Sequence, residues 1–328
     1  MTTLSTIIPN YNHGDRIGDS LDSILSQSVQ PDEVIVLDDG STDDSVAVLK
    51  EYEARHDHIR LILLEENRGV VSGCNVLFKE ARGEYIHGFP ADDIVLPGAY
   101  ERSMEQLKAN PGAGVCCADY LMVDTVSGDL EQYRLGWRDQ AGFMSPAEFA
   151  EQCKGWWVPS FTSFIKRDAL AEAGYFHEDL EWHCDWFAYF VVAFRHGVCH
   201  VPAPFAARRR HGDAYGTAAR RDTKAQEKVL RTLLEKTTSD AYRDVVGLFV
   251  RSGAMLFFNN EIDRLVMSDP ELWSMDMMML TQLPMSYRLA SCKKHIDDIW
   301  DNRLDVTTEH TSLIREKLVD GKESDGHV

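Results

Sequence analysis

The sequence lacks the features that mark secreted, membrane-spanning and nucleic-acid-binding proteins. Its seven cysteines among 328 residues include no CxxC pair, which argues against a zinc site or a disulfide framework and favours a reducing cytoplasm. It has no run of 18 apolar residues and no signal-type N-terminus, so neither a transmembrane helix nor a leader is expected. Its 34 Lys and Arg residues against 53 Asp and Glu give a net charge of −19, which disfavours a nucleic-acid partner.

The first third of the chain does contain a regular alternation of short apolar runs and segments with apolar residues at helical spacing. The apolar runs are 4–8, 34–37, 59–64 and 85–89. Strands that alternate with helices predict an α/β fold with βαβ units and a mainly parallel sheet flanked by helices. Right-handed crossovers place the carboxyl ends of parallel strands at one edge. Three polar loops should therefore converge there, at residues 9–13, 38–44 and 90–93.

The pattern changes twice further along the chain. From about residue 115 to 210 short strands mix with turn signals, which is typical of a second half of the same domain. After about residue 218 the strand signal disappears and helical spacing dominates. We predict a domain of residues 1–217 with halves 1–113 and 114–217, a helical C-terminal region of residues 218–319, and a disordered tail of residues 320–328.

Two pairs of adjacent acids follow predicted strands. Asp38 and Asp39 end one apolar run, and Asp92 and Asp93 follow another. Such carboxylates can hold a divalent cation or accept hydrogen bonds from ribose hydroxyls and base N–H groups. They can also cap the helix that follows. Because both pairs fall on the edge where open α/β sheets bind ligands, we favour a binding site over helix capping.

Three segments, in this order and spacing, resemble the family 2 glycosyltransferases of the GT-A fold. They are STIIPNYN with SLDSILSQSVQPDEVIVLDDGSTDDS, then EENRGVVSGCNVLFKEARGEYIHGFPADDIVLPGAYE, then AEAGYFHEDLEWHCDWFAYFVVAFRHG followed by RRRH. Together they cover about residues 3–212. The resemblance implies a Rossmann-like GT-A fold, a nucleotide-binding half followed by an acceptor half, and inverting transfer of a sugar from a nucleotide diphosphate donor.

The resemblance also implies roles for the loop residues. Asp39 would hydrogen-bond the base, and Asp92 and Asp93 match the end of the DxD segment, which reaches the ribose and a Mn²⁺ or Mg²⁺ ion on the phosphates. Pro90 replaces the first acid of that segment, which leaves open which of the pair binds metal. The implied nucleotide-binding residues are Pro9, Tyr11, Asn12, Asp39, Asn67, Arg68, Ala91 and Asp92, and the implied metal ligands are Asp92, Asp93 and His211.

Asp185 matches the acid that the family uses as general base. A carboxylate there would take the proton of the acceptor hydroxyl as its oxygen attacks the anomeric carbon. An acid would equally suit the start of the helix predicted over residues 186–195, and both roles can hold together. Glu181 is an alternative base. The implied acceptor contacts are Trp156, Trp157 and Glu181, although tryptophans also fill cores.

His211 and the three arginines before it have two interpretations. They could contact metal or diphosphate, or they could form a solvated strand end. Two rival enzymes fit less well. A haloacid-dehalogenase-type phosphatase needs Asp-x-Asp-Gly, and a Rossmann dehydrogenase needs GxGxxG where this chain has PNYNHGD. A non-catalytic nucleotide-binding or sugar-binding relative that recruits a partner remains open, because Pro90 and Cys184 replace acids of the family pattern.

The expected function is therefore a metal-dependent transferase that uses a nucleotide-sugar donor, with a UDP-sugar preferred. The acceptor would be a glycan or a lipid-linked glycan in polysaccharide or glycoconjugate assembly. We expect the protein to be cytoplasmic, with a place at the inner face of the membrane where lipid-linked acceptors occur. The C-terminal helices are expected to pack on the catalytic domain or to form a homo-oligomer.

Overall fold

The computed structural model describes residues 2–154, 157–210, 222–258, 261–272 and 280. The helices, strands and contacts given below belong to these residues. The sites predicted at Trp156 and His211 and the tail predicted at residues 320–328 lie outside them.

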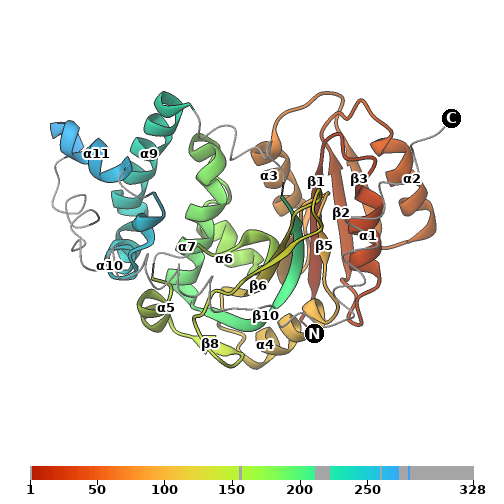
Figure 1. The fold of residues 1–328 in the computed structure, drawn as a ribbon, viewed down its shortest axis with the longest axis horizontal. Helices are drawn as coiled ribbons and strands as arrows, with labels where there is room; N and C mark the ends of the chain where they lie inside the picture. Colours follow the sequence, from red (N-terminus) through yellow and green to blue (C-terminus); the bar gives the residue numbers. More distant parts are fainter. Residues whose placement is uncertain (1, 155–156, 211–221, 259–260, 273–279, 281–328) are drawn as a thin grey trace.

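The first third of the chain forms the predicted βαβ units (Figure 1). Its strands are β1 (Leu4–Asn10), β2 (Glu33–Asp38), β3 (Ile59–Leu63) and β4 (Tyr85–Gly88), and its helices are α1 (Ile17–Leu25), α2 (Ser45–Arg55), α3 (Val70–Glu80) and α4 (Ala99–Ala109). The four strands are parallel in the order β3-β2-β1-β4. Residues 34–37 of β2 are fully buried, because helices cover both faces of a parallel sheet. The prediction for this half is confirmed.

The second half of the sheet is mixed rather than parallel. It contains β5 (Ile94–Val95), β6 (Val115–Val123), β7 (Leu130–Tyr133), β8 (Gly142–Met144), β9 (Phe164–Lys166) and β10 (Val198–Arg209). The main order is β3-β2-β1-β4-β9-β6-β10-β5, and β9 is antiparallel to both of its neighbours. The pairing of β10 with β6 shifts register on either side of Pro204, because proline has no N–H to donate to a ladder. Beyond this irregularity β10 runs to the acidic loop.

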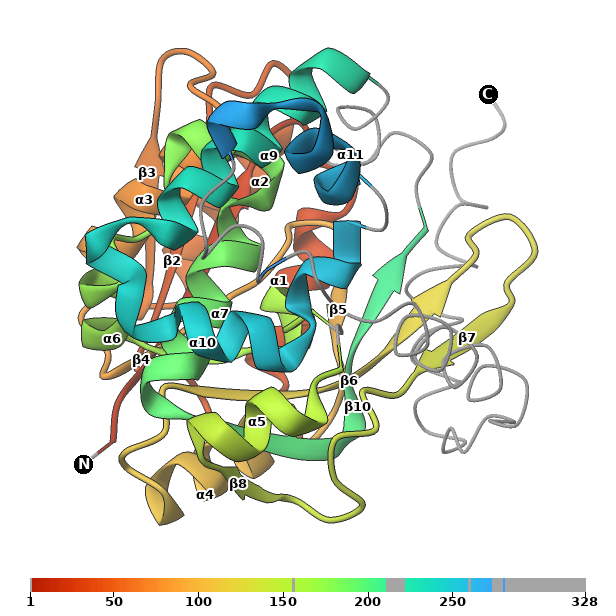
Figure 2. The same cartoon turned by 90° about the vertical axis from the view of Figure 1, so that its left-hand side faces the viewer.

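The remaining helices of the described residues follow β8 in the chain. They are α5 (Pro146–Gln152), η1 (Ser160–Thr162), α6 (Arg167–Glu172), η2 (Glu178–His183), α7 (Cys184–His196), α9 (Thr223–Thr238), η3 (Asp240–Tyr242), α10 (Arg243–Ser252), η4 (Ala254–Phe258), α11 (Glu261–Ser268) and η5 (Pro270–Leu272), where η marks a 3₁₀ helix. Nearly all of α7 is buried, as expected of a helix that is apolar on all sides. Figure 2 shows α10 lying against α7, and the contacts place α10 on α5 and α7 and α9 on η2.

The C-terminal helices share the core of the sheet domain. The Phe249 ring on α10 contacts the rings of Phe187, Phe190 and Phe194 on α7. Buried aromatic pairs of this kind stabilise packing by about 0.5–1.5 kcal/mol each beyond the area they bury. None of the helices in the described part of the chain has the length and apolar character needed to cross a bilayer.

Candidate active site

The first two edge loops are hydrogen-bonded to each other. Asn10 Nδ2 donates to Asp38 Oδ2 at 2.7 Å, and the Asn12 backbone N–H donates to Ser41 Oγ at 2.9 Å. Ser41 donates its hydroxyl and its backbone N–H to the Asp38 carboxylate at 2.7 and 2.9 Å. Asp38 is buried, and these donors compensate its charge. Asp38 therefore joins the two loops, as their predicted convergence requires.

Asp39 fastens the turn at residues 66–69, which precedes α3. Its two carboxylate oxygens accept hydrogen bonds from the backbone N–H groups of Arg68 at 2.8 Å and Gly69 at 2.9 Å. Asn67 Oδ1 also accepts from Gly69 N, at 2.9 Å. A carboxylate at the start of a helix is favoured by the helix dipole. The structure thus brings together Asp39, Asn67 and Arg68, as predicted, and shows that Asp39 shapes the turn.

Gly40 allows this turn to approach the second loop. Its φ is +71°, and a Cβ there would lie 2.8–2.9 Å from backbone atoms of Glu66 and Asn67. We expect Gly40→Ala to lower the free energy of unfolding by about 1–3 kcal/mol in urea denaturation. Gly69→Ala is the matched control, because Gly69 has φ +89° but its Cβ would meet nothing within 4 Å. Equal losses in the two variants would mean that the close approach contributes nothing.

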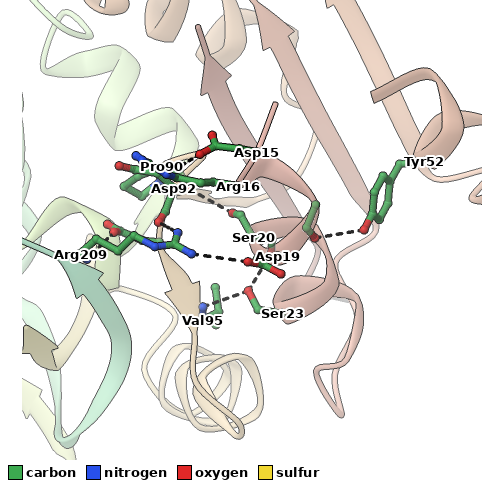
Figure 3. Close-up of polar contacts among 12 residues, drawn as sticks. Asp15, Arg16, Asp19, Ser20, Ser23, Tyr52, Pro90, Asp92, Val95 and Arg209 are labelled. Atoms are coloured by element: carbon green, nitrogen blue, oxygen red, sulfur yellow. Dashed lines mark hydrogen bonds and ion pairs between the residues drawn. The ribbon is translucent and has the colours of Figure 1, made fainter. Parts of the chain in front are cut away.

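The acidic loop at residues 90–93 is held against α1 (Figure 3). Ser20 Oγ donates to the Pro90 carbonyl at 3.1 Å, and Ser23 Oγ accepts from the Val95 N–H at 3.0 Å. The apolar segment that follows the loop becomes helical only at Ala99, where α4 begins. Gly98, just before it, has a left-handed φ of +80°, which a helix cannot contain.

Arg209 holds the same loop from β10. Its backbone N–H donates to Asp93 Oδ1 at 2.9 Å, and its guanidinium donates to the Asp92 carbonyl and lies 3.5 Å from Asp19 Oδ2 (Figure 3). Its side chain is only 6% exposed. Arg209 therefore fits neither the diphosphate contact nor the solvated strand end that the sequence suggested for the basic run. Its guanidinium is buried and bonded within the protein.

The two acids of this loop lie in different environments. Asp93 is 2% exposed, and burial followed by the charge of Asp92 raises its pKa to about 7, although Arg208 and Arg209 act in the opposite direction. Asp92 is half-buried. Among the described residues, no three His, Cys, Asp or Glu side chains are grouped to hold a metal ion. One carboxylate still suits Mn²⁺ or Mg²⁺, which bind through one or two carboxylates together with substrate phosphates.

Asp185 lies in the first turn of α7. Its Oδ2 accepts a hydrogen bond from Ser160 Oγ at 3.0 Å, and its Oδ1 accepts from the Trp186 N–H at 2.6 Å. Burial, and then the charge of Asp185, raises the pKa of the Cys74 thiol to about 12 and that of Cys184 well above its usual range. Both thiols therefore remain neutral beside Asp185. No signal in the sequence pointed to Ser160, because a serine in a loop has no distinguishing pattern.

The segment η1 connects Asp185 to the acidic loop. Ser160 in η1 contacts Asp185, and the carbonyl of the next residue, Phe161, lies 3.1 Å from His87 Nε2 on β4. The acidic loop begins two residues after β4 ends. Asp185 and the loop of Asp92 are therefore held through one short helical turn.

The other predicted residues are placed as follows. Pro9 is half-buried at the end of β1, Tyr11 and Asn12 are exposed on the first loop, and Ala91 is buried. Trp157 is half-buried and its ring lies 5.9 Å from that of Phe161, which makes it at least partly a core residue. Glu181 has a φ of +43°, which is unfavourable for a residue with a side chain.

A parallel half-sheet with acidic edge loops, joined to a mixed half with an acid at the start of α7, defines a GT-A type of α/β fold. Solved structures agree. Staphylococcus aureus TarS 1–349 in complex with UDP-GlcNAc gives a TM-score of 0.63 at 15% identity over 95% of this chain and 90% of that one. The mannosyltransferase PcManGT from Pyrobaculum calidifontis in complex with GDP-Man and Mn²⁺ gives 0.50 at 16% identity over 92% and 88%. At these identities the similarity establishes the fold alone.

The family model for glycosyl transferase family 2 matches residues 5–173, just over half of the chain. The chain belongs to this family, which confirms the family predicted from its motifs.

Curated relatives are similar over shorter stretches. An uncharacterized glycosyltransferase, YibD, of Escherichia coli K12 is 37% identical over 37% of this chain and 36% of its own length. Chondroitin synthase of Escherichia coli is 35% identical over 32% and 15%, and poly-β-1,6-N-acetyl-D-glucosamine synthase of Staphylococcus epidermidis is 32% identical over 34% and 27%. The chain thus matches about a third or less of the length of these relatives.

Proposed function

We propose that this glycosyltransferase moves a sugar from a nucleotide diphosphate donor, preferably a UDP-sugar, to a hydroxyl of a glycan or glycoconjugate, with inversion. The observation that carries the proposal is the arrangement at one sheet edge. The first loop, the second loop and the turn at residues 66–69 are hydrogen-bonded together, the acidic loop is held on α1, and Asp185 is linked to β4 through η1. Ligands of open α/β sheets bind at the carboxyl ends of the strands, where these loops lie.

The nucleotide would bind between the first loop and the turn that Asp39 fastens. Tyr11 and Asn12 are exposed there, and Asn67 and Arg68 border the same place. Each oxygen of Asp39 accepts one backbone N–H and retains a lone pair for a base N–H. The complexes of TarS with UDP-GlcNAc and of PcManGT with GDP-Man support a nucleotide-sugar donor.

We assign the metal to Asp92 rather than Asp93. Asp93 is buried and fixed by the backbone of Arg209, which makes it a support for the loop, whereas Asp92 is half-buried. A Mn²⁺ or Mg²⁺ ion bound there would neutralise charge on the departing diphosphate. The Mn²⁺ in the PcManGT complex supports this cofactor.

Asp185 would be the general base. As the acceptor oxygen forms its bond to the anomeric carbon, its proton passes to the Asp185 carboxylate, and the bond from that carbon to the diphosphate breaks on the opposite face. The two hydrogen bonds from Ser160 and Trp186 hold the carboxylate in one orientation. An oriented base of this kind is required for a well-aligned attack.

The acceptor we propose is a glycan or a lipid-linked glycan, and the proposed location is the cytoplasm at the inner face of the membrane. Two relatives named for polysaccharide synthesis, chondroitin synthase and poly-β-1,6-N-acetyl-D-glucosamine synthase, support this class of acceptor.

Thermal unfolding with UDP and with GDP, each with and without Mn²⁺, tests the donor site. UDP with Mn²⁺ at about 100 times its Kd should raise Tm by about 5 °C. Asp92→Asn should remove the part of this shift that depends on Mn²⁺ and keep the part that does not, because Asp39 and the first loop are unchanged. If no nucleoside diphosphate raises Tm, the proposed donor site is wrong.

A further inference from the structure

The segment that carries the proposed base has an unfavourable backbone conformation. Glu181, four residues before Asp185, has φ +43° and ψ −116°, and it separates two turns that are not continuous with each other. Leu180 and His183, on either side, are both fully buried. Residues in such conformations persist only where the surrounding structure holds them. Contacts from outside η2 must therefore fix residues 178–185.

Gln226 on α9 supplies the central polar contact. Its Oε1 accepts a hydrogen bond from Trp182 Nε1 at 2.7 Å and lies 3.1 Å from His183 Nε2. Its Nε2 donates to Glu261 Oε2 on α11 at 2.9 Å. Gln226 is 4% exposed. A buried amide therefore links the segment before Asp185 to two helices of the C-terminal region.

Chemistry fixes the direction of every bond in this cluster. The indole N–H of Trp182 can only donate, so the oxygen of Gln226 must face it. The amide nitrogen then faces Glu261, whose ionised carboxylate can only accept. His183 must carry its proton on Nε2 in order to donate to the same oxygen. A buried cluster in which each of these donors has an acceptor specifies one arrangement.

Apolar contacts reinforce the same junction. The ring of Phe258 in η4 lies 4.9 Å from the rings of both His183 and Trp186. Trp186 directly follows Asp185 and donates its backbone N–H to that carboxylate. Residues after 222 thus contact the proposed base's segment on both sides of Asp185. Figure 1 shows α9 beside α7, and α11 packs on α9 and η4.

We propose that Gln226 is a positioning residue for the transfer step. It holds Trp182 and His183, and through them the strained Glu181 and the first turn of α7, where Asp185 lies. The C-terminal helices are then part of the catalytic unit, although they lie beyond residues 5–173, which match the family model. This inference rests on the proposed function, in which Asp185 is the base.

Gln226→Leu should reduce kcat by about 10-fold to 100-fold, because a displacement of the base by about 1 Å costs a factor of that size. The Kd for UDP with Mn²⁺, measured by titration calorimetry, should stay within twofold of wild type, because the nucleotide loops belong to the other half of the sheet. If the role of Gln226 were purely structural, kcat would fall and the Kd for UDP with Mn²⁺ would rise together.

An exchange of the two polar groups supplies a sharper test. Gln226→Glu alone places two carboxylates face to face and should reduce kcat as strongly as Gln226→Leu. The double variant Q226E/E261Q puts an acceptor-only group opposite Trp182 and His183 and lets the new amide at position 261 donate to it. It should recover kcat to within about threefold of wild type.

Lys236→Met is the matched control. It removes an ion pair of 3.0 Å between α9 and Asp179, which joins the same two elements at the surface. Its kcat should equal that of wild type. Wild-type kcat in folded Gln226→Leu, or a double variant as impaired as Gln226→Glu, overturns the positioning role. The proposed function is tested separately with Asp185→Asn. If that variant turns over substrate as fast as wild type, Asp185 is not the base and the proposed function fails.

Discussion

Asp185→Asn should lower kcat by about 10²-fold to 10⁴-fold and leave the Kd for UDP within twofold of wild type. An amide cannot take the proton of the acceptor hydroxyl. The substitution preserves the local geometry, because the amide oxygen can accept from the Trp186 N–H while the amide nitrogen donates to Ser160 Oγ. The loss can therefore be attributed to proton transfer. Release of UDP from a panel of UDP-sugars with glycan acceptors provides the measurement.

Glu181→Gln is the companion variant for this prediction, since Glu181 was the alternative base in the sequence. Glu181 has an unfavourable φ, and glutamine would adopt the same backbone conformation at the same cost. The substitution therefore removes only the charge. If Glu181→Gln abolishes transfer and Asp185→Asn does not, the base has been assigned to the wrong residue. If wild type binds UDP but transfers no sugar from any donor in the panel, the non-catalytic alternative is favoured.

The sequence predicted the strands and loops of the first half of the sheet well because their signals are local. The apolar run that ends in Asp38 and Asp39 is a strand followed by its own loop, and parallel strands must deliver such loops to one edge. The same reasoning placed the acidic loop beside them. Identification of Asp39 as a partner of residues 67 and 68 came from the family resemblance, and the backbone hydrogen bonds agree with the grouping.

The role of Arg209 could not be predicted, because it depends on a contact between residues 117 positions apart. In the sequence three consecutive arginines resemble a solvated strand end. Only the antiparallel pairing of β10 with β5 brings Arg209 beside the acidic loop. The antiparallel strand β9 was not predicted for a related reason. It has only three residues, and so short a segment does not indicate whether its strand runs parallel or antiparallel to its neighbours.

Gln226 did leave a signal in the sequence. It lies on the buried stripe of α9, three, four and seven residues before Val229, Leu230 and Leu233. A polar residue at an apolar position of an amphipathic helix indicates a buried hydrogen bond. The sequence could not name its partners, because Trp182 and Glu261 lie in separate elements.

A buried chain of hydrogen bonds through His87 connects the sheet to η1. The His87 ring lies 2.9 Å from Tyr100 Oη and 3.1 Å from the Phe161 carbonyl, and Tyr100 Oη lies 2.9 Å from Thr6 Oγ1. A carbonyl can only accept, so Nε2 carries the proton and Nδ1 accepts from Tyr100. The neutral ring satisfies both neighbours, whereas a second proton on Nδ1 would remove its acceptor.

Burial lowers the pKa of His87 from 6.5 to about 4, although the Phe161 carbonyl acts in the opposite direction. The unfolded chain therefore binds a proton at this residue below about pH 6.5, while the folded protein does not until about pH 4. Stability falls wherever the unfolded state binds more protons as the pH is lowered. His87 alone should cost about 2 kcal/mol of stability between about pH 8 and pH 5.

Urea denaturation of wild type and His87→Gln across about pH 5–8 measures this contribution. The glutamine side chain retains a donor and an acceptor but does not titrate, so the variant should be less stable at about pH 8 and should lose about 2 kcal/mol less than wild type on going to about pH 5. Parallel curves would show that His87 does not control the acid sensitivity. Because η1 holds Asp185 through Ser160, the pH at which His87 protonates should also limit the acid range in which the transferase keeps its base in place.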